Sequence, residues 1–454
     1  MKKILHSSKF STALILFIIF FPLRASAKGD VSILRWQEDT TLTESGKNSE
    51  ILIEGKTRDF SPNQVMTAFS ISFDPKREIK ITKVMCDGRH TDYSFNNNSL
   101  KVKFPQEKSN NKTLAIAFSF EEKYDQIGKY LRHELIDIPA FAAGAEAKIV
   151  INFPGFLESA TLNPNVTKSG SSFIYSNIVG KDGVREILKL TPTSSSWNIV
   201  IKVKVNADRP LSNATIFLPT YFQNGGQKIQ NVVTTSSVAP IKQELEGTTR
   251  NLKFNTSETE ILIENRAKIS TGKNNRMQIM RNAASYLSYS GEEFRLLSPI
   301  LERIKQDAKY RELPLHAKIG KFVHDFIRYD ANYTGKLPSI REILQNPVGV
   351  CTEYSELYTA LARIAGIPAL SVDGGACGEY ESCQGHAWNM IYLNGRWVDV
   401  DATWDLMSGV VSSSHVYFNE SGKGDVAVQY FSNRESLESV RSKMDFEMKL
   451  VEQN

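Results

Sequence analysis

Residues in the last third of the chain have the types and spacing of a thiol active site. Cys351 opens a stretch in which Tyr354, Leu357, Tyr358 and Leu361 recur at i, i+3, i+4 and i+7, which predicts an amphipathic helix that begins at the cysteine. The unpaired N–H groups and the positive dipole end of a helix N-terminus favour the thiolate, the nucleophilic form of cysteine. The same N–H groups could donate to an oxyanion. Inert buried cysteines also occur at helix starts, so position alone does not establish chemistry.

A base and a carboxylate are predicted to meet on a β-hairpin downstream of this helix. Asn394-Gly395 lies between two β-rich runs and indicates a two-residue turn, in which Leu393 pairs with Arg396. Counting outward from this turn places His386 and Asp401 on the same sheet face as diagonal neighbours, roughly 7–8 Å apart at the backbone. The hairpin therefore brings an imidazole and a carboxylate within reach of each other.

The hairpin register alone leaves a choice between two aspartates. Asp405 is the other diagonal neighbour of His386 if the strand continues that far, and it is as well placed as Asp401. Asp399 lies on the same face but two residues further away. Cys351, His386 and one of these carboxylates would form a triad in which the histidine takes the thiol proton and the aspartate orients the imidazole.

Helices are expected around the cysteine. Residues 276–289 and 299–310 have helical patterns, the second with Pro299 at its first position, where a missing N–H costs nothing. Residues 314–329 carry a clear apolar stripe, and His324 falls off it, which predicts a solvent-facing side chain. Ser339-Ile-Arg-Glu342 has the form of a capping box and predicts a further helix start.

The preceding half of the chain has a different texture. Residues 28–270 read as short strands rich in Val, Ile, Phe and Thr and separated by turn residues, which predicts an all-β, sandwich-like region of one or two domains, with a break that could fall near Asp137–Gly144. The predicted strands include Val31–Trp36, Ile51–Glu54, Met66–Phe73, Lys101–Phe104, Leu114–Phe120, Lys148–Phe153, Ile199–Val205 and Glu260–Glu264. This region shows no catalytic constellation, since His90 and His133 are isolated.

The first 27 residues have the order of a secretory signal peptide. A basic start is followed by the apolar run Ala13–Leu23 and by small residues at Ala25-Ser26-Ala27, and the run is shorter than a typical membrane span. An uncleaved anchor is the alternative. Cleavage would lower the formal charge from +5 to +1, because the segment holds four basic residues and no acid. We therefore expect a secreted or periplasmic protein with no stable membrane span and no nucleic-acid partner.

Four cysteines extend this expectation. Cys377 and Cys383 are close in sequence, in a glycine-rich loop of an exported protein, and are predicted to form a disulfide. Cys86 and Cys351 would then be free thiols, Cys86 as a small buried residue. Two alternatives remain open, namely two reduced thiols in the loop, or a bond from Cys351 to a loop cysteine that would switch off the nucleophile.

Four motifs together resemble the core of the transglutaminase-like superfamily over about residues 310–410. They are Gly-Val-Cys-x-Glu-Tyr-Ser at 349–355, Gly-Ile-Pro at 366–368, His-Ala-Trp at 386–388 and Trp-Val-Asp-Val-Asp-Ala-Thr-Trp-Asp at 397–405. The resemblance implies a papain-like α+β domain that spans residues 271–454 around this core, with Cys351 as nucleophile, His386 as base and Asp401 as the third member. A second oxyanion donor is not fixed by the motifs, and Tyr329 is a weak candidate.

The resemblance implies an exported thiol enzyme that acts on amide bonds of protein or peptide substrates, with hydrolysis favoured. A glutamine-directed crosslinking transglutaminase is the alternative outcome, because the triad is common to both. A non-catalytic binding protein that uses the β-rich region is a third alternative. A zinc site made of Cys351, Cys377, Cys383 and His386 is disfavoured by its spacing, so no metal or other cofactor is expected. The sequence does not indicate an oligomeric state.

Overall fold

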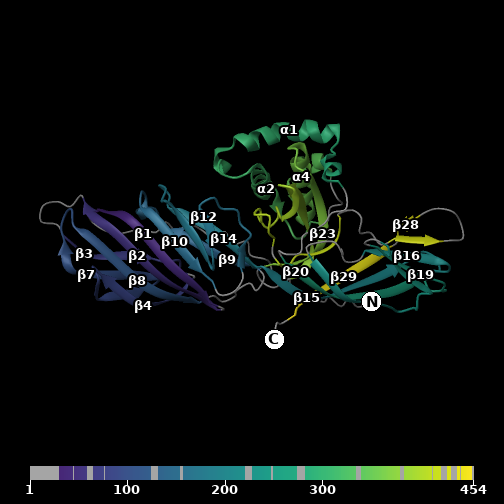
Figure 1. Cartoon of the computed structure of the whole chain (residues 1–454), viewed down its shortest axis with the longest axis horizontal. Coiled ribbons are helices and arrows are strands. Elements are labelled where there is room, and N and C mark those ends of the chain that lie inside the picture. Colours follow the sequence, from purple (N-terminus) through teal and green to yellow (C-terminus); the bar gives the residue numbers. More distant parts are fainter. Residues whose placement is uncertain are drawn as a thin grey trace, which may run out of the picture.

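The computed structural model describes residues 30–43, 45–58, 65–75, 77–123, 131–153, 157–219, 227–246, 249–272, 282–333, 339–378, 383–411, 413–420, 427–430, 437–439 and 441–451. The predicted signal segment, residues 1–27, lies outside them. Within the described ranges no helix combines the length and apolar character needed to span a membrane. The chain forms two β-rich units and one α+β domain (Figure 1).

The first β unit spans residues 30–192 around one hydrophobic core. Its alternating strands place apolar residues such as Ile53, Ile116 and Phe118 inward. The core includes Ile136, Ile138, Ala142 and Ala145, so it does not divide at Asp137–Gly144. The unit has an eight-stranded sheet and two three-stranded sheets. In sheet order these are β12(Val166–Ser169), β13(Ser172–Ile178), β10(Glu146–Asn152), β1(Asp30–Thr43), β2(Gly46–Arg58), β8(Thr113–Lys123), β4(Glu78–Cys86) and β5(Arg89–His90); β3(Met66–Ser72), β7(Ser99–Lys108) and β6(Tyr93–Asn96); and β11(Leu157–Ser159), β14(Val184–Pro192) and β9(Arg132–Ile138), with the short η1(Ala140–Ala142).

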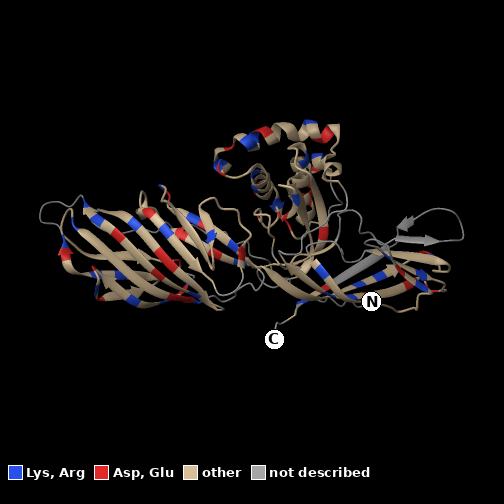
Figure 2. Ribbon diagram, in the orientation of Figure 1, with Lys and Arg blue, Asp and Glu red and all other residues tan. Residues whose placement is uncertain are grey.

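The second β unit is built from two separate parts of the chain. Its core begins at Trp197 and includes Met448. One sheet has the order β17(Gln227–Ser236), β20(Glu260–Gly272), β15(Ser194–Asn206) and β29(Arg441–Leu450), and the other β18(Lys242–Glu246), β19(Thr249–Phe254), β16(Ala214–Pro219), β27(Ala427–Tyr430) and β28(Leu437–Ser439). The last strands thus return to this unit, and the α+β domain is inserted between β20 and β27. Figure 2 shows basic and acidic residues interspersed along the strands of both units.

The α+β domain packs four helices on one side of the sheet β25(Arg396–Val400), β24(Cys383–Leu393), β23(Ala369–Cys377) and β26(Val416–Glu420). The helices are α1(Gly291–Gln306), α2(Leu315–Phe326), α3(Ile340–Gln345) and α4(Cys351–Ile364), with the 3-10 turns η2(Ala283–Leu287) and η3(Ala308–Tyr310) and the parallel pair β21(Arg328–Tyr329) and β22(Val348–Gly349). Leu357, Tyr358 and Leu361 of α4 are fully buried against this sheet and α2. The order of an all-β region followed by an α+β domain confirms the predicted fold class.

Two helix boundaries differ from the sequence prediction. Helix α1 begins eight residues before Pro299, because the side chain of Ser290 accepts a hydrogen bond from the Glu293 N–H and the carboxylate of Glu293 accepts one from the Ser290 N–H. Pro299 therefore lies inside α1. Of the predicted helix 276–289, the described part forms only η2.

Candidate active site

Cys351 is the first residue of α4, as the sequence predicts, and its thiol is free and half-buried. The backbone before it is fixed by Glu353, whose buried carboxylate accepts a hydrogen bond from the Val350 N–H at 2.8 Å. A side chain at Gly349 would place Cβ 2.5 Å from Cγ of Glu353, so only glycine fits there. The chain therefore enters the helix along one defined path, which presents the cysteine at the helix N-terminus.

A buried polar network holds α4 against the sheet one turn after the cysteine. The Ser355 hydroxyl donates to the Trp388 carbonyl at 2.9 Å and lies 2.5 Å from the Ser371 hydroxyl. The Asn389 side-chain amide donates to the Ser355 carbonyl at 2.9 Å and to the Thr359 hydroxyl at 2.9 Å. Because each polar group would be costly to bury without a partner, the network fixes the distance between the helix and β24.

The predicted hairpin register is observed. Leu393 pairs with Arg396, and the ladder of β24 and β25 continues to Asn389 opposite Val400. Asn394 and Gly395 both have positive φ, at 51° and 79°, as a two-residue hairpin turn requires. The strand ends before Asp401, whose backbone instead pairs with Leu406 in an isolated bridge.

This geometry brings His386 and Asp401 together in the interior. The His386 Nε2–H donates to Asp401 Oδ2 at 2.8 Å, and both residues are buried. Asp401 Oδ1 accepts from the backbone N–H groups of Thr403 at 2.8 Å and Trp404 at 3.2 Å. Burial would raise the pKa of Asp401, but the charge and hydrogen bonds of His386 and of His415 hold that pKa well below its usual range. Asp401 is therefore ionised at neutral pH.

The His386 imidazole connects this carboxylate to the thiol. With Nε2 on Asp401, the second ring nitrogen is left to make the hydrogen bond between His386 and Cys351. Burial alone would lower the pKa of His386, but the Asp401 charge, the Asp401 hydrogen bond and the Cys351 hydrogen bond raise it to about 10. The imidazole also packs against two indoles, with ring centroids 4.5 Å apart for Trp404 and 6.1 Å apart for Trp388. This packing restricts the ring to one orientation.

The two other aspartates considered from the sequence have different partners. Asp405 adopts a positive φ of 55°, and its carboxylate pairs with Lys321 of α2 and, at 3.7 Å, with Lys189 of β14. Asp399 accepts a hydrogen bond from the Tyr417 hydroxyl, and burial raises the pKa of Asp399 to about 6. Neither carboxylate replaces Asp401 beside His386.

The loop after Asp401 is held by residues from three other regions. The Lys189 ammonium group donates to the Trp404 carbonyl at 2.6 Å, and the Ser408 hydroxyl donates to the Ser159 carbonyl at 2.8 Å, so the first β unit contacts this loop. The His324 imidazole of α2 donates to the Ala402 carbonyl at 3.1 Å. The prediction that His324 faces solvent is therefore wrong, because the helix face beyond the apolar stripe is covered by the active-site loop.

Tyr329 lies close to the thiol, where the sequence placed a weak oxyanion candidate. Burial raises the pKa of Tyr329, and the charge of the neighbouring Cys351 adds to this, while a hydrogen bond with Gln384 lowers it. Gln384 precedes His386 by two residues on β24 and was not predicted from the sequence. The Tyr329 hydroxyl and the Gln384 amide are polar groups on the thiol side of the site that could donate to an oxyanion together with the first N–H groups of α4.

Cys377 and Cys383 form a disulfide across the end of the β23–β24 hairpin, with a Cα–Cα distance of 4.0 Å. A zinc site that uses both sulfurs is incompatible with this bond. Among the described residues, the group able to hold a metal is His386, Asp401 and His415, whose ligand atoms lie within 4.8 Å of one another. Metal coordination there would replace the hydrogen bonds to Asp401 and remove His386 from its contact with the carboxylate.

His415 and Trp404 join Gln384 as site residues that were not predicted from the sequence. His415 is fully buried and places Nε2 3.2 Å from Asp401 Oδ2. A second histidine 14 residues after the aspartate has no recognisable spacing, because the intervening loop is shaped by contacts with distant residues. Trp404 belongs to the motif at 397–405, so its proximity to His386 could have been anticipated from the motif.

Comparisons with known proteins agree with this geometry in part of the chain. Residues 301–402 match the sequence profile of the Transglutaminase-like superfamily. The human Kyphoscoliosis peptidase is 34% identical over 88 residues, which are 17% of this chain and 13% of the relative. The mouse Kyphoscoliosis peptidase is 36% identical over 80 residues, 16% of this chain and 12% of the relative. The matched segment thus covers about an eighth of these relatives.

A solved structure from Cytophaga hutchinsonii, described as a candidate cysteine protease, is 14% identical with a TM-score of 0.42. It covers 57% of this chain and 92% of its own. The profile match and the observed α+β arrangement together show that the C-terminal part of the chain contains a transglutaminase-like domain, preceded by β-sheet units.

Proposed function

We propose that this protein is an exported thiol hydrolase that cleaves amide bonds of protein or peptide substrates. The observation that carries the proposal is the buried pair of His386 and Asp401 at 2.8 Å, with the imidazole hydrogen-bonded to a free cysteine at the start of α4. A helix-start cysteine alone is common, but a cysteine bonded to a histidine that a buried carboxylate orients is the arrangement of a nucleophile and its base.

The chemistry follows from these groups. His386 takes the Cys351 proton, and the raised pKa of His386 keeps the resulting imidazolium–thiolate pair stable. The thiolate attacks the amide carbonyl and forms a C–S bond, and the imidazolium donates its proton to the nitrogen as the C–N bond breaks. Water, deprotonated by His386, then attacks the thioester, and the Cys351 thiolate leaves and the carboxylic acid is released. Asp401 keeps the imidazole in place through both steps.

Hydrolysis is favoured over crosslinking by the names of the human and mouse relatives, both peptidases, with which the matched segment shares about a third of its residues. Crosslinking would follow the same steps with a lysine amine in place of water. A purely binding role leaves the bonded Cys351, His386 and Asp401 unexplained, since the buried imidazole and carboxylate are costly to bury without a task.

Export is proposed on two grounds. Residues 1–27 have the order of a signal peptide, and the disulfide of Cys377 and Cys383 suits an oxidising compartment. Sequencing the N-terminus of protein recovered from culture medium or from a periplasmic extract tests this. A new N-terminus at Lys28 is expected, and an intact Met1 in cytosolic material would contradict it.

The enzymatic proposal is tested by labelling with an electrophilic thiol probe, followed by a peptide-library screen analysed by mass spectrometry. A hydrolase gives new N-termini, a glutamine amidase gives a deamidated residue, and a transglutaminase gives an isopeptide product when a lysine donor is present. Absence of Cys351 labelling in folded protein at neutral pH would overturn the proposal.

A further inference from the structure

His415 is hydrogen-bonded to the same carboxylate as the proposed base, His386. Asp401 Oδ2 lies 2.8 Å from His386 Nε2 and 3.2 Å from His415 Nε2, while Oδ1 accepts two backbone N–H groups. The carboxylate therefore accepts two hydrogen bonds at each oxygen. An aspartate side chain rotates broadly about its last torsion, so donors at both oxygens are needed to fix its plane.

The His415 ring is enclosed by the aromatic residues that also surround the base. Its centroid lies 5.0 Å from Trp388, 5.1 Å from Trp404 and 5.4 Å from His386, each at a steep interplanar angle. The side chain is fully buried. An imidazole in such a place loses water on all sides, and its hydrogen bond to the ionised Asp401 compensates for this loss.

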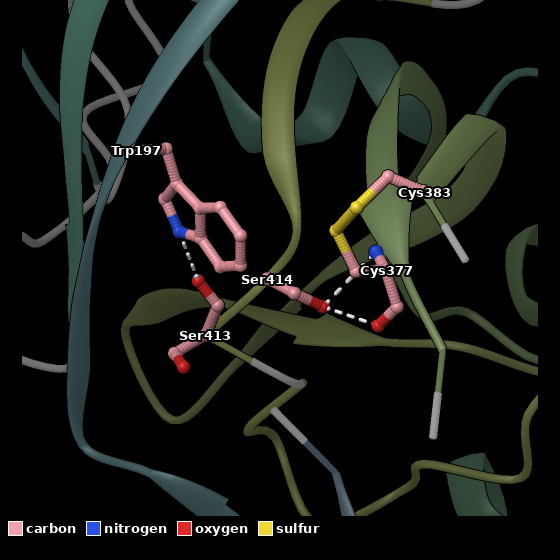
Figure 3. Close-up of a disulfide and its surroundings, with 5 residues drawn as sticks. All are labelled: Trp197, Cys377, Cys383, Ser413 and Ser414. Atoms are coloured by element: carbon pink, nitrogen blue, oxygen red, sulfur yellow. Dashed lines mark hydrogen bonds between the residues drawn. A yellow bond between two sulfur atoms is a disulfide. The ribbon is translucent and has the colours of Figure 1, made fainter. Parts of the chain in front are cut away.

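The backbone before His415 is anchored to the second β unit and to β14 of the first. The Ser413 carbonyl accepts from the Trp197 indole N–H at 3.1 Å (Figure 3). It also accepts from the Thr271 hydroxyl, and the Ser413 side chain lies 2.7 Å from the Ser195 hydroxyl. The Ser413 N–H donates to the Thr191 hydroxyl at 2.9 Å. Residues from β14, β15 and β20 thus fix the position from which His415 extends.

The next residue is anchored to the disulfide. The Ser414 hydroxyl donates to the Cys377 carbonyl at 2.7 Å and accepts from the Cys377 N–H at 3.2 Å (Figure 3). Two successive residues therefore connect the second β unit and the disulfide-bonded hairpin end to His415. Contacts with several distant segments therefore fix the position of His415, which lies directly before β26.

We propose that His415 is a fourth member of the site, a positioning residue that holds the Asp401 carboxylate in the orientation in which it pairs with His386. The inference rests on the proposed thiol chemistry. During turnover His386 gains and loses a proton, so its hold on Asp401 changes, whereas the His415 N–H continues to donate. The second β unit then has a defined part in the site, because it fixes the segment that carries His415.

Two variants with opposite changes test the proposal. His415→Phe keeps an aromatic ring among the indoles but removes the N–H, and His415→Gln loses the ring but keeps an N–H donor of similar reach. The readout is the second-order rate of Cys351 alkylation by iodoacetamide, which requires no substrate, together with turnover once a substrate is found. H415F is expected to lower both about 10- to 100-fold, by analogy with residues whose hydrogen bonds orient the ligands of a metal site. H415Q is expected to recover most of that loss.

A packing role predicts the opposite ranking, because Phe fills the site better than Gln. Equal rates for H415F and the wild type, or a slower H415Q than H415F, would overturn the inference. His90→Phe, an exposed position on the first β unit, is the control for the chemical change. If wild-type Cys351 itself is alkylated no faster than a free cysteine, the proposed function fails, and this result is distinct from a fast wild type with an equally fast H415F.

Should H415F not fold, imidazole N–H signals of ¹⁵N-histidine-labelled Cys351→Ala protein supply a second measurement. The hydrogen-bonded Nε2–H protons of His386 and His415 are expected to shift in a further Asp401→Asn variant, whereas the His316 Nε2–H, which donates to the Met407 carbonyl at 3.2 Å, should not. A His415 signal that does not respond to Asp401→Asn would overturn the proposal.

Discussion

Two segments bring a histidine to the Asp401 carboxylate: the hairpin of β24 and β25 carries His386, and the loop that follows carries His415. The two segments are held in place in different ways. The hairpin is local, since the Asn394-Gly395 turn and the strand ladder fix its register within a few residues. The loop depends on partners far along the chain, from Ser159 and Lys189 to Trp197. The local sequence of the hairpin therefore fixes the position of His386. Contacts with the β units fix the position of the loop that carries Asp401 and His415.

Substitution of the triad residues, which the hairpin and the loop bring together, should have the largest effect on labelling and turnover. Cys351→Ala is expected to abolish covalent labelling, and Asp401→Asn to lower turnover by a factor of about 10⁴, because the members of a triad act together. Probe labelling and turnover of folded variants provide the measurement. Cys86→Ala is the matched control: burial raises the pKa of Cys86 to about 11, so its thiol should not react. Full turnover in Cys351→Ala protein would contradict the assignment.

The pH profile of activity tests whether His386 of the hairpin is paired with Asp401 of the loop. Its pKa is raised to about 10, so the imidazolium should persist well above the ordinary value of 6.5. Stability from its pairing with Asp401 is fully present below about pH 6.5 and is lost as the pH rises through 10. We therefore expect the alkaline limb of the turnover profile near pH 10, because the imidazolium must protonate the leaving nitrogen. A limb near pH 6.5 would show that the imidazole is not paired.

Separating the loop from the first β unit should have a smaller effect. Lys189→Met removes the donor to the Trp404 carbonyl and one partner of Asp405, while Lys321 continues to pair with Asp405. Loss of this contact should loosen the Trp404 indole, which is stacked on His386. The activation barrier should rise by about 0.5–2 kcal/mol, which lowers kcat roughly 2- to 30-fold. Lys204→Met, an exposed residue of the second β unit, is the control. An unchanged kcat would mean that the loop holds its shape without the β unit.

The features of the site that could be predicted from the sequence are those fixed by local patterns. The start of α4 at Cys351 and the pairing of Leu393 with Arg396 depend on apolar spacing and turn chemistry, which are visible in a short window. The register also allowed Asp405 as a partner of His386, and only the family motif favoured Asp401. In the structure the strand ends before Asp401, so the diagonal to Asp405 is never formed.

His415 and the return of the chain to the second β unit lie beyond such reasoning. Trp197 and Ser413 are 216 positions apart, and the pairing of β29 with β15 joins residues separated by a similar length. No local pattern specifies which distant strands will meet. Helix α1 is a different case, because its start depends on the capping pair Ser290 and Glu293, which lies within a short window of sequence, and not on Pro299.

Reduction of the disulfide should weaken the support of the loop at Ser414, a point that lies away from the catalytic residues. Reduction frees a ring that constrains the unfolded chain by about 2–2.5 kcal/mol, and it loosens Cys377, which Ser414 contacts directly. A Cys377→Ser, Cys383→Ser variant should therefore melt earlier and be alkylated at Cys351 more slowly, by less than H415F. Peptide mapping without reductant should recover the Cys377–Cys383 pair. A Cys351 crosslink as the main species would instead indicate a redox-controlled nucleophile.

The smallest expected effect lies in the hairpin turn. Gly395 has a φ of 79°, and an added Cβ would meet no atom within 4 Å, so a substitution there tests backbone strain alone. Gly395→Val should lower the free energy of unfolding by about 1–2 kcal/mol, the cost of a left-handed residue with a side chain, as chemical denaturation can measure. Asn394→Gly, at a φ of 51°, should be tolerated, because glycine adopts that conformation freely. The rate of Cys351 alkylation should stay unchanged in both variants, since five paired positions and the buried Asn389 network also fix the strand. A large loss of alkylation in Gly395→Val would show that the turn alone sets the register, and the hairpin would then be as fragile as the loop.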